Sequence, residues 1–409
     1  MTRDYEILRS LGERVAELAA LPIQDEKKKL WTANNDLKPV RPMVYIDQLP
    51  WFEFDRTDEM KRECEDPFLH TIEEKLKQII YRWKHFPADM VVENRVDVDK
   101  TVHNLNYGIN IIEKTLDTDS ENDIKSHQYK DQLKDDESLD KLKNDEIWVD
   151  TKLDEEHLEI CNEIFKDIMP VRLCGVQLNC AVWDRIAQMM TAEGIIYNII
   201  DRPEFVKRIV KKFVALSIST VEQCEKLGLL DEKLQYIHCT GAYTNDMPTD
   251  GMEDGKAKAH NVWALGMAQI FSTVSPEMHN EYEIELVKPL YEKFGMMYYG
   301  CCEPLDNVIK YVRKIKNVRK ISVSPWANND ICADNIGSDY VFSSKINPSF
   351  ICANEFAEKN IRNQIEAAYN ACKRNKTPLE LIQKDVSSLN GHLDYIDRWE
   401  KIAMEYALR

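Results

Sequence analysis

The stretch SPEMHNEYEIELVKPLYEKFGMMYYGCCEP, residues Ser275 to Pro304, contains a helix pattern, a strand pattern and a corner in succession. Ser275 followed by Pro276 is a typical helix start, because serine caps free backbone amides and proline fits the first turn. The apolar run MMYYGC has the length of a buried strand, and Glu303-Pro304 predicts a turn after it. A helix followed by a short buried strand is typical of α/β folds.

Similar alternations recur through much of the chain. The predicted strands are RPMVYID (41–47), DMVVENRV (89–96), VRLCGVQL (171–178), LQYIHC (234–239), RKISVSP (319–325) and DYVFSSKI (339–346). Helical spacing of apolar residues predicts helices between them, including one over 261–271, and two further helices close the chain. Six to eight such units favour one closed (β/α)8 barrel of the TIM type over an open sheet.

The chain divides into an extension, a barrel and an insertion. Apolar residues at helical spacing predict a helix over 4–20, so we assign 1–40 to an N-terminal helical extension and 41–409 to the barrel. A charged insertion at about 114–146 is acidic, rich in lysine and almost free of aromatic residues. This composition is unsuited to a core, so we expect a mobile surface excursion or a solvated helical hairpin there.

Composition excludes several classes of function. The 409 residues carry 71 acids against 54 bases, and a net charge of −17 disfavours binding to nucleic acid or anionic lipid. The N-terminal residues carry charges throughout and lack an apolar core of signal-peptide length, and no run of 18 apolar residues occurs. With eleven cysteines, we therefore expect reduced thiols in a cytoplasm. No dinucleotide or phosphate-loop motif occurs, and neither does the D-x-H-x-x-G pattern of corrinoid carriers. Any corrinoid would therefore arrive on a separate protein.

Reactive side chains gather at the predicted strand ends, where α/β barrels place their chemistry. These residues are Asp47, Glu93, Cys174, His238, Cys239, Cys301, Cys302, Glu303 and Lys345. The acids Asp47, Glu93 and Glu303 are candidate general acids or bases, with solvated loop acids as the alternative for the first two. Lys345 is a candidate to hold a substrate anion. Candidate walls of the substrate pocket are Trp51, Tyr243, Trp326 and Asn329.

Four of these residues are candidate zinc ligands, because zinc prefers thiolate and imidazole donors. They are His238, Cys239, Cys301 and Cys302. Adjacent cysteines on an extended strand point to opposite faces, so we expect one of Cys301 and Cys302 to face the site and the other to pack behind it. The alternative is that all are small buried side chains, which is the usual role of free cysteine.

The motifs YGCCEP, ISVSPWAN and YVFSSKINP, with the helix that begins at Ser275, resemble the uroporphyrinogen decarboxylase superfamily over roughly 202–348. This superfamily includes the heme-pathway decarboxylase and corrinoid-dependent methyltransferases, so the resemblance implies a (β/α)8 barrel. The decarboxylase has an Arg-rich RQAGR loop where this chain has IDQLPWFEF. Without those bases, binding of a porphyrinogen with many carboxylates is disfavoured.

The resemblance to the methyltransferases implies a zinc site, and this chain departs from its motif. Their zinc is held by His-x-Cys at the strand before the 304–315 helix and by a later cysteine. Here Tyr299 or Gly300 stands in place of the histidine, and VFSSKINP offers no later cysteine. Either another set holds zinc, such as Cys301 or Cys302 with His238, Cys239 or an acid, or zinc is absent.

Three functions follow as hypotheses. The first is a methyltransferase that moves a methyl group between a small O-, N- or S-methyl compound, or a thiol, and cobalt on a separate corrinoid protein, with help from zinc. The second is a metal-free decarboxylase or lyase acting on a small aromatic or tetrapyrrole-related acid, with Asp47 or Glu93 as the acid and Lys345 on the carboxylate. The third is a non-catalytic barrel that binds a corrinoid or a partner protein.

Overall fold

A six-stranded parallel sheet is the centre of the computed structural model, which describes residues 2–106, 110–116 and 125–409. Its strands in spatial order are β1 (Met43–Ile46), β14 (Leu379–Gln383), β13 (Val341–Lys345), β12 (Val318–Val323), β11 (Met296–Tyr299) and β10 (Trp263–Gly266). Every residue of these strands is buried except the partly buried Arg319, as expected for a parallel sheet covered on both faces. The predicted α/β class is confirmed.

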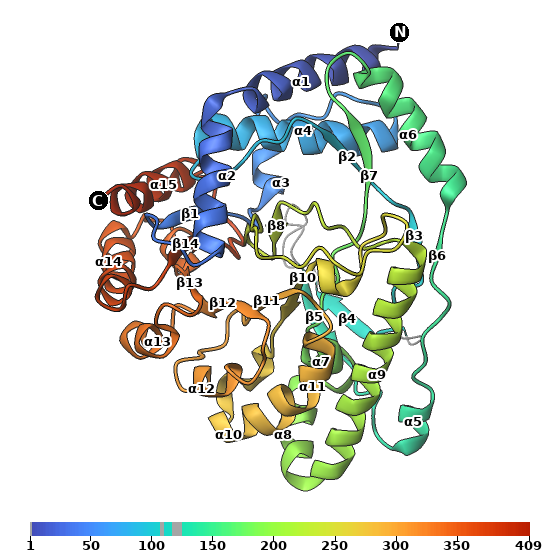
Figure 1. Cartoon of the computed structure of the whole chain (residues 1–409), viewed down its shortest axis with the longest axis vertical. Helices are drawn as coiled ribbons and strands as arrows, with labels where there is room; N and C mark the ends of the chain where they lie inside the picture. The colour runs from blue at the N-terminus through green and yellow to red at the C-terminus, as the bar shows by residue number, and fades with distance from the viewer. Residues whose placement is uncertain (1, 107–109, 117–124) are drawn as a thin grey trace.

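Helices follow the strands of this sheet in chain order and lie outside it (Figure 1). They are α10 (Pro276–His279), the π-helical turn η3 (Asn280–Ile284), α11 (Glu285–Tyr291), α12 (Ile309–Val312), α13 (Asn329–Ile336), the 3-10 turn η4 (Pro348–Phe350), α14 (Glu358–Asn375) and α15 (Asp394–Ala407). The predicted cap is present, since the Ser275 side chain accepts a hydrogen bond from the Met278 backbone amide. Consecutive strands β10 to β14 are neighbours, so each helical connection returns the chain to the same end of the sheet.

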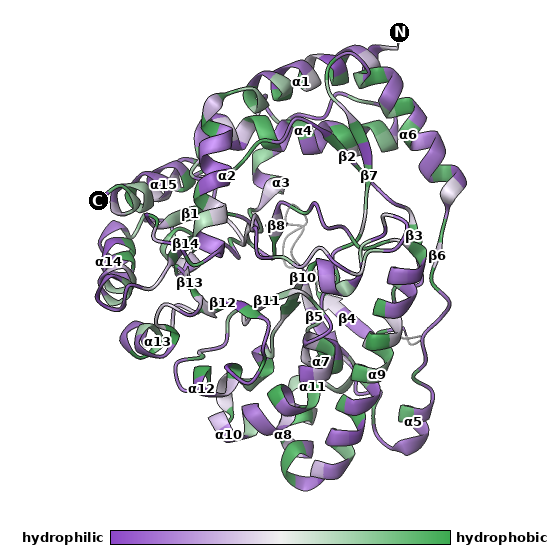
Figure 2. Cartoon of the chain, in the orientation of Figure 1, coloured by the Kyte–Doolittle hydropathy of each residue, from purple (hydrophilic) through white to green (hydrophobic). Residues whose placement is uncertain are grey.

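The first half of the chain adds a second parallel pair, β2 (Val96–Asp99) with β7 (Val171–Cys174), surrounded by helices. These helices are α1 (Arg3–Ala19), α2 (Pro22–Asn35), α3 (Trp51–Phe54), α4 (Pro67–His85), α6 (Thr151–Phe165), α7 (Val182–Met190), α8 (Ala192–Asp201) and α9 (Pro203–Leu227). Figure 2 shows apolar and polar residues alternating around α1, α4 and α9, so each helix has an apolar side to pack on the core.

The bounds or types of several predicted elements were wrong. The strand expected over 89–96 begins only at Val96. The segment LQYIHC, expected as a single strand, contributes to a tight antiparallel hairpin of β8 (Tyr236–Ile237) and β9 (Thr240–Gly241). The helix expected over 261–271 is instead β10, flanked by the 3-10 turns η1 (Ala259–Asn261) and η2 (Gln269–Thr273). A strand buried on both faces is continuously apolar, so its pattern does not distinguish it from a buried helix.

In its described part the charged insertion contains a short antiparallel strand pair, one short helix and otherwise irregular structure, and not a helical hairpin. Its elements and their neighbours are β3 (Val102–His103), β4 (Glu113–Leu116), β5 (Ser126–Tyr129), α5 (Asp136–Asp140) and β6 (Trp148–Val149). Residues 117–124 of the insertion lie outside the described residues. Leu133 and Leu142 are fully buried in the main core, so the expectation that this stretch avoids the core was wrong at these positions, whereas β4 is exposed as expected.

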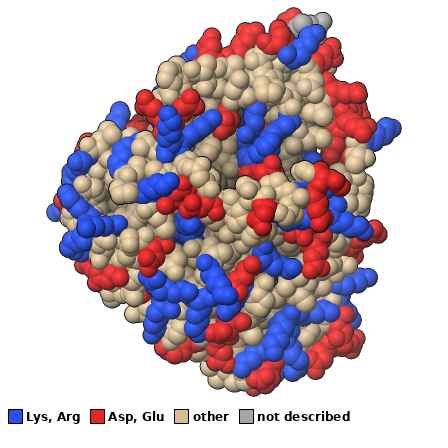
Figure 3. All heavy atoms as spheres, viewed as in Figure 1, with Lys and Arg blue, Asp and Glu red and all other residues tan. Residues whose placement is uncertain are grey.

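The visible surface carries both signs of charge. Figure 3 shows lysine and arginine side chains interspersed with aspartate and glutamate over one face of the molecule. Among residues 2–106, 110–116 and 125–409, no helix combines the length and apolar composition needed to cross a bilayer.

Candidate functional site

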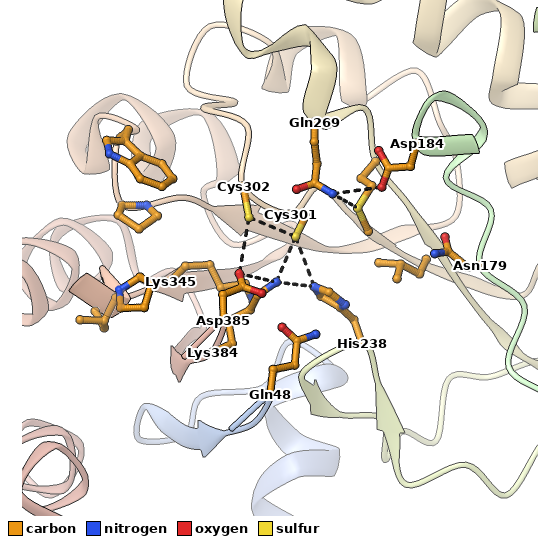
Figure 4. A pocket seen from close by; sticks show the side chains of 16 residues that line it. Gln48, Asn179, Asp184, His238, Gln269, Cys301, Cys302, Lys345, Lys384 and Asp385 are labelled. Atoms are coloured by element: carbon orange, nitrogen blue, oxygen red, sulfur yellow. Dashed lines mark hydrogen bonds and ion pairs between the residues drawn. The ribbon is translucent and has the colours of Figure 1, made fainter. Parts of the chain in front are cut away.

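A cavity of about 590 Å3 lies at the carboxyl ends of the six parallel strands (Figure 4). Each strand end contributes at least one residue to its wall. From β10 to β1, these residues are Met267, Cys301, Cys302, Trp326, Lys345, Ile346, Lys384, Asp385 and Gln48. Parallel α/β sheets place ligands outside the carboxyl ends of their strands, so this cavity is the candidate functional site.

Both adjacent cysteines line this cavity, contrary to the expectation that only one would. The strand β11 ends at Tyr299, and Gly300 then takes a left-handed conformation with φ of +92°. The alternation of a strand therefore no longer applies to Cys301 and Cys302, whose sulfur atoms lie 3.4 Å apart. Cys301 is buried, whereas Cys302 is partly exposed.

Glu303 holds this corner in place and does not line the cavity. Its two carboxylate oxygens accept hydrogen bonds from the backbone amides of Cys301 and Ala268, each at 3.0 Å. Burial raises the pKa of Glu303 to about 7. Glu303, predicted as a catalytic acid, is thus a positioning residue that ties the corner after β11 to the end of β10.

Replacing Gly300 with alanine is expected to lower the free energy of unfolding by about 1–3 kcal/mol, because a side chain is strained at positive φ. The new Cβ would also lie 2.5 Å from Leu305 Cδ1 and so would move the corner that carries both thiols. Urea unfolding and the alkylation rate of Cys301 measure the two effects. Gly251→Ala is the control, because Gly251 has φ of +78° and nothing within 4 Å of its added Cβ. An unchanged alkylation rate in Gly300→Ala would contradict the expectation.

His238 reaches the same cavity from the β8–β9 hairpin. As one of its two turn residues it has φ of +57°, a conformation that is uncommon for residues other than glycine. Its Nε2 atom lies 3.6 Å from Cys301 Sγ, and its ring packs against Tyr298. Strained conformations of this kind are concentrated at functional sites.

Lys384 and Asp385 follow β14 and complete the cluster, and the sequence patterns did not reveal them. Lys384 Nζ lies 3.0 Å from each of Cys301 Sγ, His238 Nε2 and Asp385 Oδ2. Asp385 Oδ2 is also 3.5 Å from Cys302 Sγ. Figure 4 shows these five side chains converging from three separate elements of the chain.

The cluster favours a thiolate at Cys301. The hydrogen bond with Cys302 contributes most to lowering the pKa of Cys301, and the positive charge of Lys384 adds to this effect. The same hydrogen bond raises the pKa of Cys302, so one thiolate is shared within the pair. Reactive cysteines have such cationic neighbours, whereas thiols that only pack in a core do not.

Lys384 carries the positive charge next to this thiolate. Burial opposes that charge, but the Cys239 and Cys301 thiolates outweigh it and raise the pKa of Lys384. Burial likewise opposes a charge on His238, while Cys239 and Cys301 raise its pKa. Two cations cannot hydrogen-bond to each other at 3.0 Å, so we assign the charge to Lys384 and a neutral imidazole, accepting at Nε2, to His238.

Four side chains, His238, Cys301, Cys302 and Asp385, form what we call the donor cluster. Donor atoms of Cys301, Cys302 and Asp385 all lie within 4.8 Å of one another, and His238 adds an imidazole beside Cys301. Neighbouring donors are 3.4–3.6 Å apart, close to the separation of about 3.3–3.8 Å between ligand atoms on a tetrahedral zinc. Cys301, Cys302 and Asp385 therefore form a compact set of three donors whose types suit zinc, whereas His238 is close to Cys301 but outside that set and would have to shift to become a fourth ligand.

The opposite wall of the cavity is polar and acidic. Asp184, in the first turn of α7, accepts a hydrogen bond from Gln269 Nε2 at 3.0 Å. Burial raises the pKa of Asp184, and the charge of Cys301 adds to this effect. Neither residue follows a predicted strand, so reasoning from strand ends missed both.

Cys239 and Lys345 interact with each other beneath the donor cluster. Lys345 Nζ donates hydrogen bonds to Cys239 Sγ at 3.1 Å and to Ser343 Oγ at 2.9 Å. Burial opposes ionisation of Cys239, but the charge of Lys345 helps to lower its pKa. Lys345 lines the cavity as predicted, with its ammonium engaged by protein groups, and Cys239 is absent from the cavity wall.

Of the remaining predicted acids and pocket-wall residues, some line the cavity and others lie elsewhere in the protein. Trp326 lines the cavity, and Trp51 lines an adjoining hollow that shares Gln48 and Asp385 with it. The residues outside the cavity wall are Asp47, Glu93, Tyr243 and Asn329. Glu93 is bonded to Lys28 Nζ at 2.7 Å and to the Tyr243 hydroxyl at 2.8 Å. Asp47 interacts electrostatically with the partly buried Arg82.

Comparison with known proteins does not assign this site. No protein-family model matches the chain, and no curated protein matches its sequence. The chemistry of the cavity must therefore be argued from its residues.

Proposed function

We propose that this protein is a corrinoid-dependent methyltransferase with a zinc-assisted site in the donor cluster. The observation that carries the proposal is the convergence of two sulfurs, an imidazole and a carboxylate in one cavity at the strand ends. Soft donors of this kind select zinc over magnesium or calcium. The motif resemblance to corrinoid-dependent methyltransferases supports the same activity.

The residues of the cavity have separate roles in this proposal. His238, Cys301, Cys302 and Asp385 would hold zinc, which would polarise the heteroatom that carries or receives the methyl group. The carboxyl of Asp184, whose pKa is raised, can hydrogen-bond to a polar group of the substrate on the opposite wall. Trp326 at the rim is 65% exposed and offers an apolar contact to a docking corrinoid protein.

We also propose that the sheet closes into a (β/α)8 barrel. At one edge, β10 is bridged in parallel to Asn179, and Cys180 N donates to Leu265 O at 2.9 Å. At the other edge, Asp89 N donates to Val44 O of β1 at 3.0 Å, and β2 follows soon after in the chain. The β2–β7 pair and a parallel bridge from Val176 to Leu230 supply pairing between these edges.

Methyl transfer to free cob(I)alamin is the direct test. We expect zinc-loaded protein to convert cob(I)alamin to methylcob(III)alamin with at least one donor among methoxylated aromatics, methylated amines and methyl thioethers. The methyl group moves to cobalt, and the oxygen, nitrogen or sulfur atom that carried it keeps the electron pair of the broken bond and then takes up a proton. The absorption spectrum of the corrinoid measures this step. Stoichiometric zinc without methylation by any of these donors, even with a corrinoid protein supplied, would contradict the proposal.

One observation favours decarboxylation as the second candidate. Asp184 has a raised pKa and faces the cavity, so it could protonate a carbanion left by loss of CO2. The residues first named for this reaction do not support it, because Asp47 and Glu93 lie outside the cavity wall. Release of CO2 from small aromatic acids by zinc-free protein would favour this candidate over methyl transfer.

A further inference from the structure

The ammonium of Lys384 occupies the position that a metal ion would need. Its Nζ atom is 3.0 Å from Cys301 Sγ, from His238 Nε2 and from Asp385 Oδ2. Lys384 is only 2% exposed, so this cation is enclosed by the donors and not placed on the surface. Figure 4 shows its side chain entering between Asp385 and His238 from the end of β14.

A divalent ion and this ammonium cannot share the donors. Zinc bonded to the same three atoms at about 2.0–2.3 Å would lie within about 3 Å of Nζ, with no ligand between the two cations. The lone pairs of His238 Nε2 and Cys301 Sγ that now accept hydrogen bonds from Lys384 are those that a metal would take. In a buried site, salt would screen the repulsion between the metal ion and the Lys384 ammonium only weakly.

We propose that Lys384 is a built-in cation of the donor cluster, which a thiophilic divalent metal must displace in order to bind. Without metal, Lys384 neutralises the Cys301 thiolate and keeps three of the four donors, Cys301, His238 and Asp385, together. With metal, the lysine side chain turns into the cavity of about 590 Å3, which has room for it. Its ammonium is then free to hydrogen-bond to the substrate heteroatom that gains negative charge when it loses a methyl group.

This inference rests on the metal site of the proposed function but not on methyl transfer itself. Lys345 provides the internal comparison, since it also lines the cavity and is 4% exposed. Its ammonium is bonded to Cys239 and Ser343 instead of the donor cluster. A metal in the cluster should therefore leave Lys345 in place.

Zinc affinity of the Lys384→Met variant is the first test. We expect it to bind zinc on the order of ten- to a hundredfold more tightly than the unchanged protein, because a competing buried cation is removed. Competition against a chromophoric chelator at constant pH measures the affinity. Lys345→Met should change it by less than about threefold. Equal or weaker zinc binding by folded Lys384→Met protein would overturn the proposal.

Chemical labelling of the unchanged protein is the second test and needs no variant to fold. Zinc should lower alkylation of Cys301 by iodoacetamide and raise acylation of Lys384, both measured by mass spectrometry. Acylation of Lys345 should stay the same. Protection of Cys301 without increased acylation of Lys384 would show that the lysine is not displaced. Neither test uses a methyl donor or a corrinoid, so failure of this inference is distinguishable from failure of methyl transfer.

Discussion

Cys301→Ala is expected to reduce methyl transfer by more than about a hundredfold and to remove stoichiometric zinc. Loss of a partner that merely orients a metal ligand costs about ten- to a hundredfold, so loss of a central ligand should cost more. Cys301 is central because its sulfur contacts His238, Cys302 and Lys384. Zinc analysis and the cob(I)alamin assay measure the two effects.

The matched variants distinguish the role of Cys301 from general damage. Cys302→Ala should have a smaller effect, because Cys302 is partly exposed and water can replace its sulfur at a zinc ion. Cys180→Ala should retain zinc and activity, since Cys180 is buried away from the cavity wall and burial raises the pKa of its thiol to about 12. Retention of zinc by Cys301→Ala, or a larger loss in Cys302→Ala, would contradict the arrangement proposed here.

The sequence predicted the part of the site that lies on well-marked strands. The run MMYYGC was correctly predicted as a buried strand with Cys301 and Cys302 at its carboxyl end. His238 was also predicted as a candidate ligand, although its LQYIHC segment was taken for a single strand. Its position in a hairpin turn depends on a positive φ that no sequence pattern specified.

The sequence missed Lys384 and Asp385 because it missed β14. The segment LELIQ has a glutamate as the second residue of a buried strand, which weakened the apolar signal. That glutamate, Glu380, is buried because Lys320 of β12 reaches it inside the sheet. Pairing between residues 60 positions apart is a tertiary effect that a local pattern does not reveal. Pro378 before the segment was the available sign of a new element.

This buried ion pair leads to the largest expected effect on stability. Lys320 and Glu380 are both fully buried, and Glu380 Oε2 accepts hydrogen bonds from Lys320 Nζ at 2.9 Å and from Thr240 Oγ1 at 2.8 Å. Lys320→Met should lower the free energy of unfolding by about 3–5 kcal/mol, because it leaves a buried carboxylate without its cation. Urea unfolding measures this difference.

A second substitution distinguishes an unpaired charge from lost packing. Adding Glu380→Leu to Lys320→Met should recover most of the stability, since apolar replacement of a whole buried ion pair is often neutral. For comparison, Glu285→Ala breaks a partly exposed pair with Lys314 and should cost less than about 1 kcal/mol. If the double variant were no more stable than Lys320→Met, the loss would come from packing. The pair connects β12 and β14 below the cavity and binds Thr240 beside Cys239, so its removal should also loosen the hairpin that carries His238.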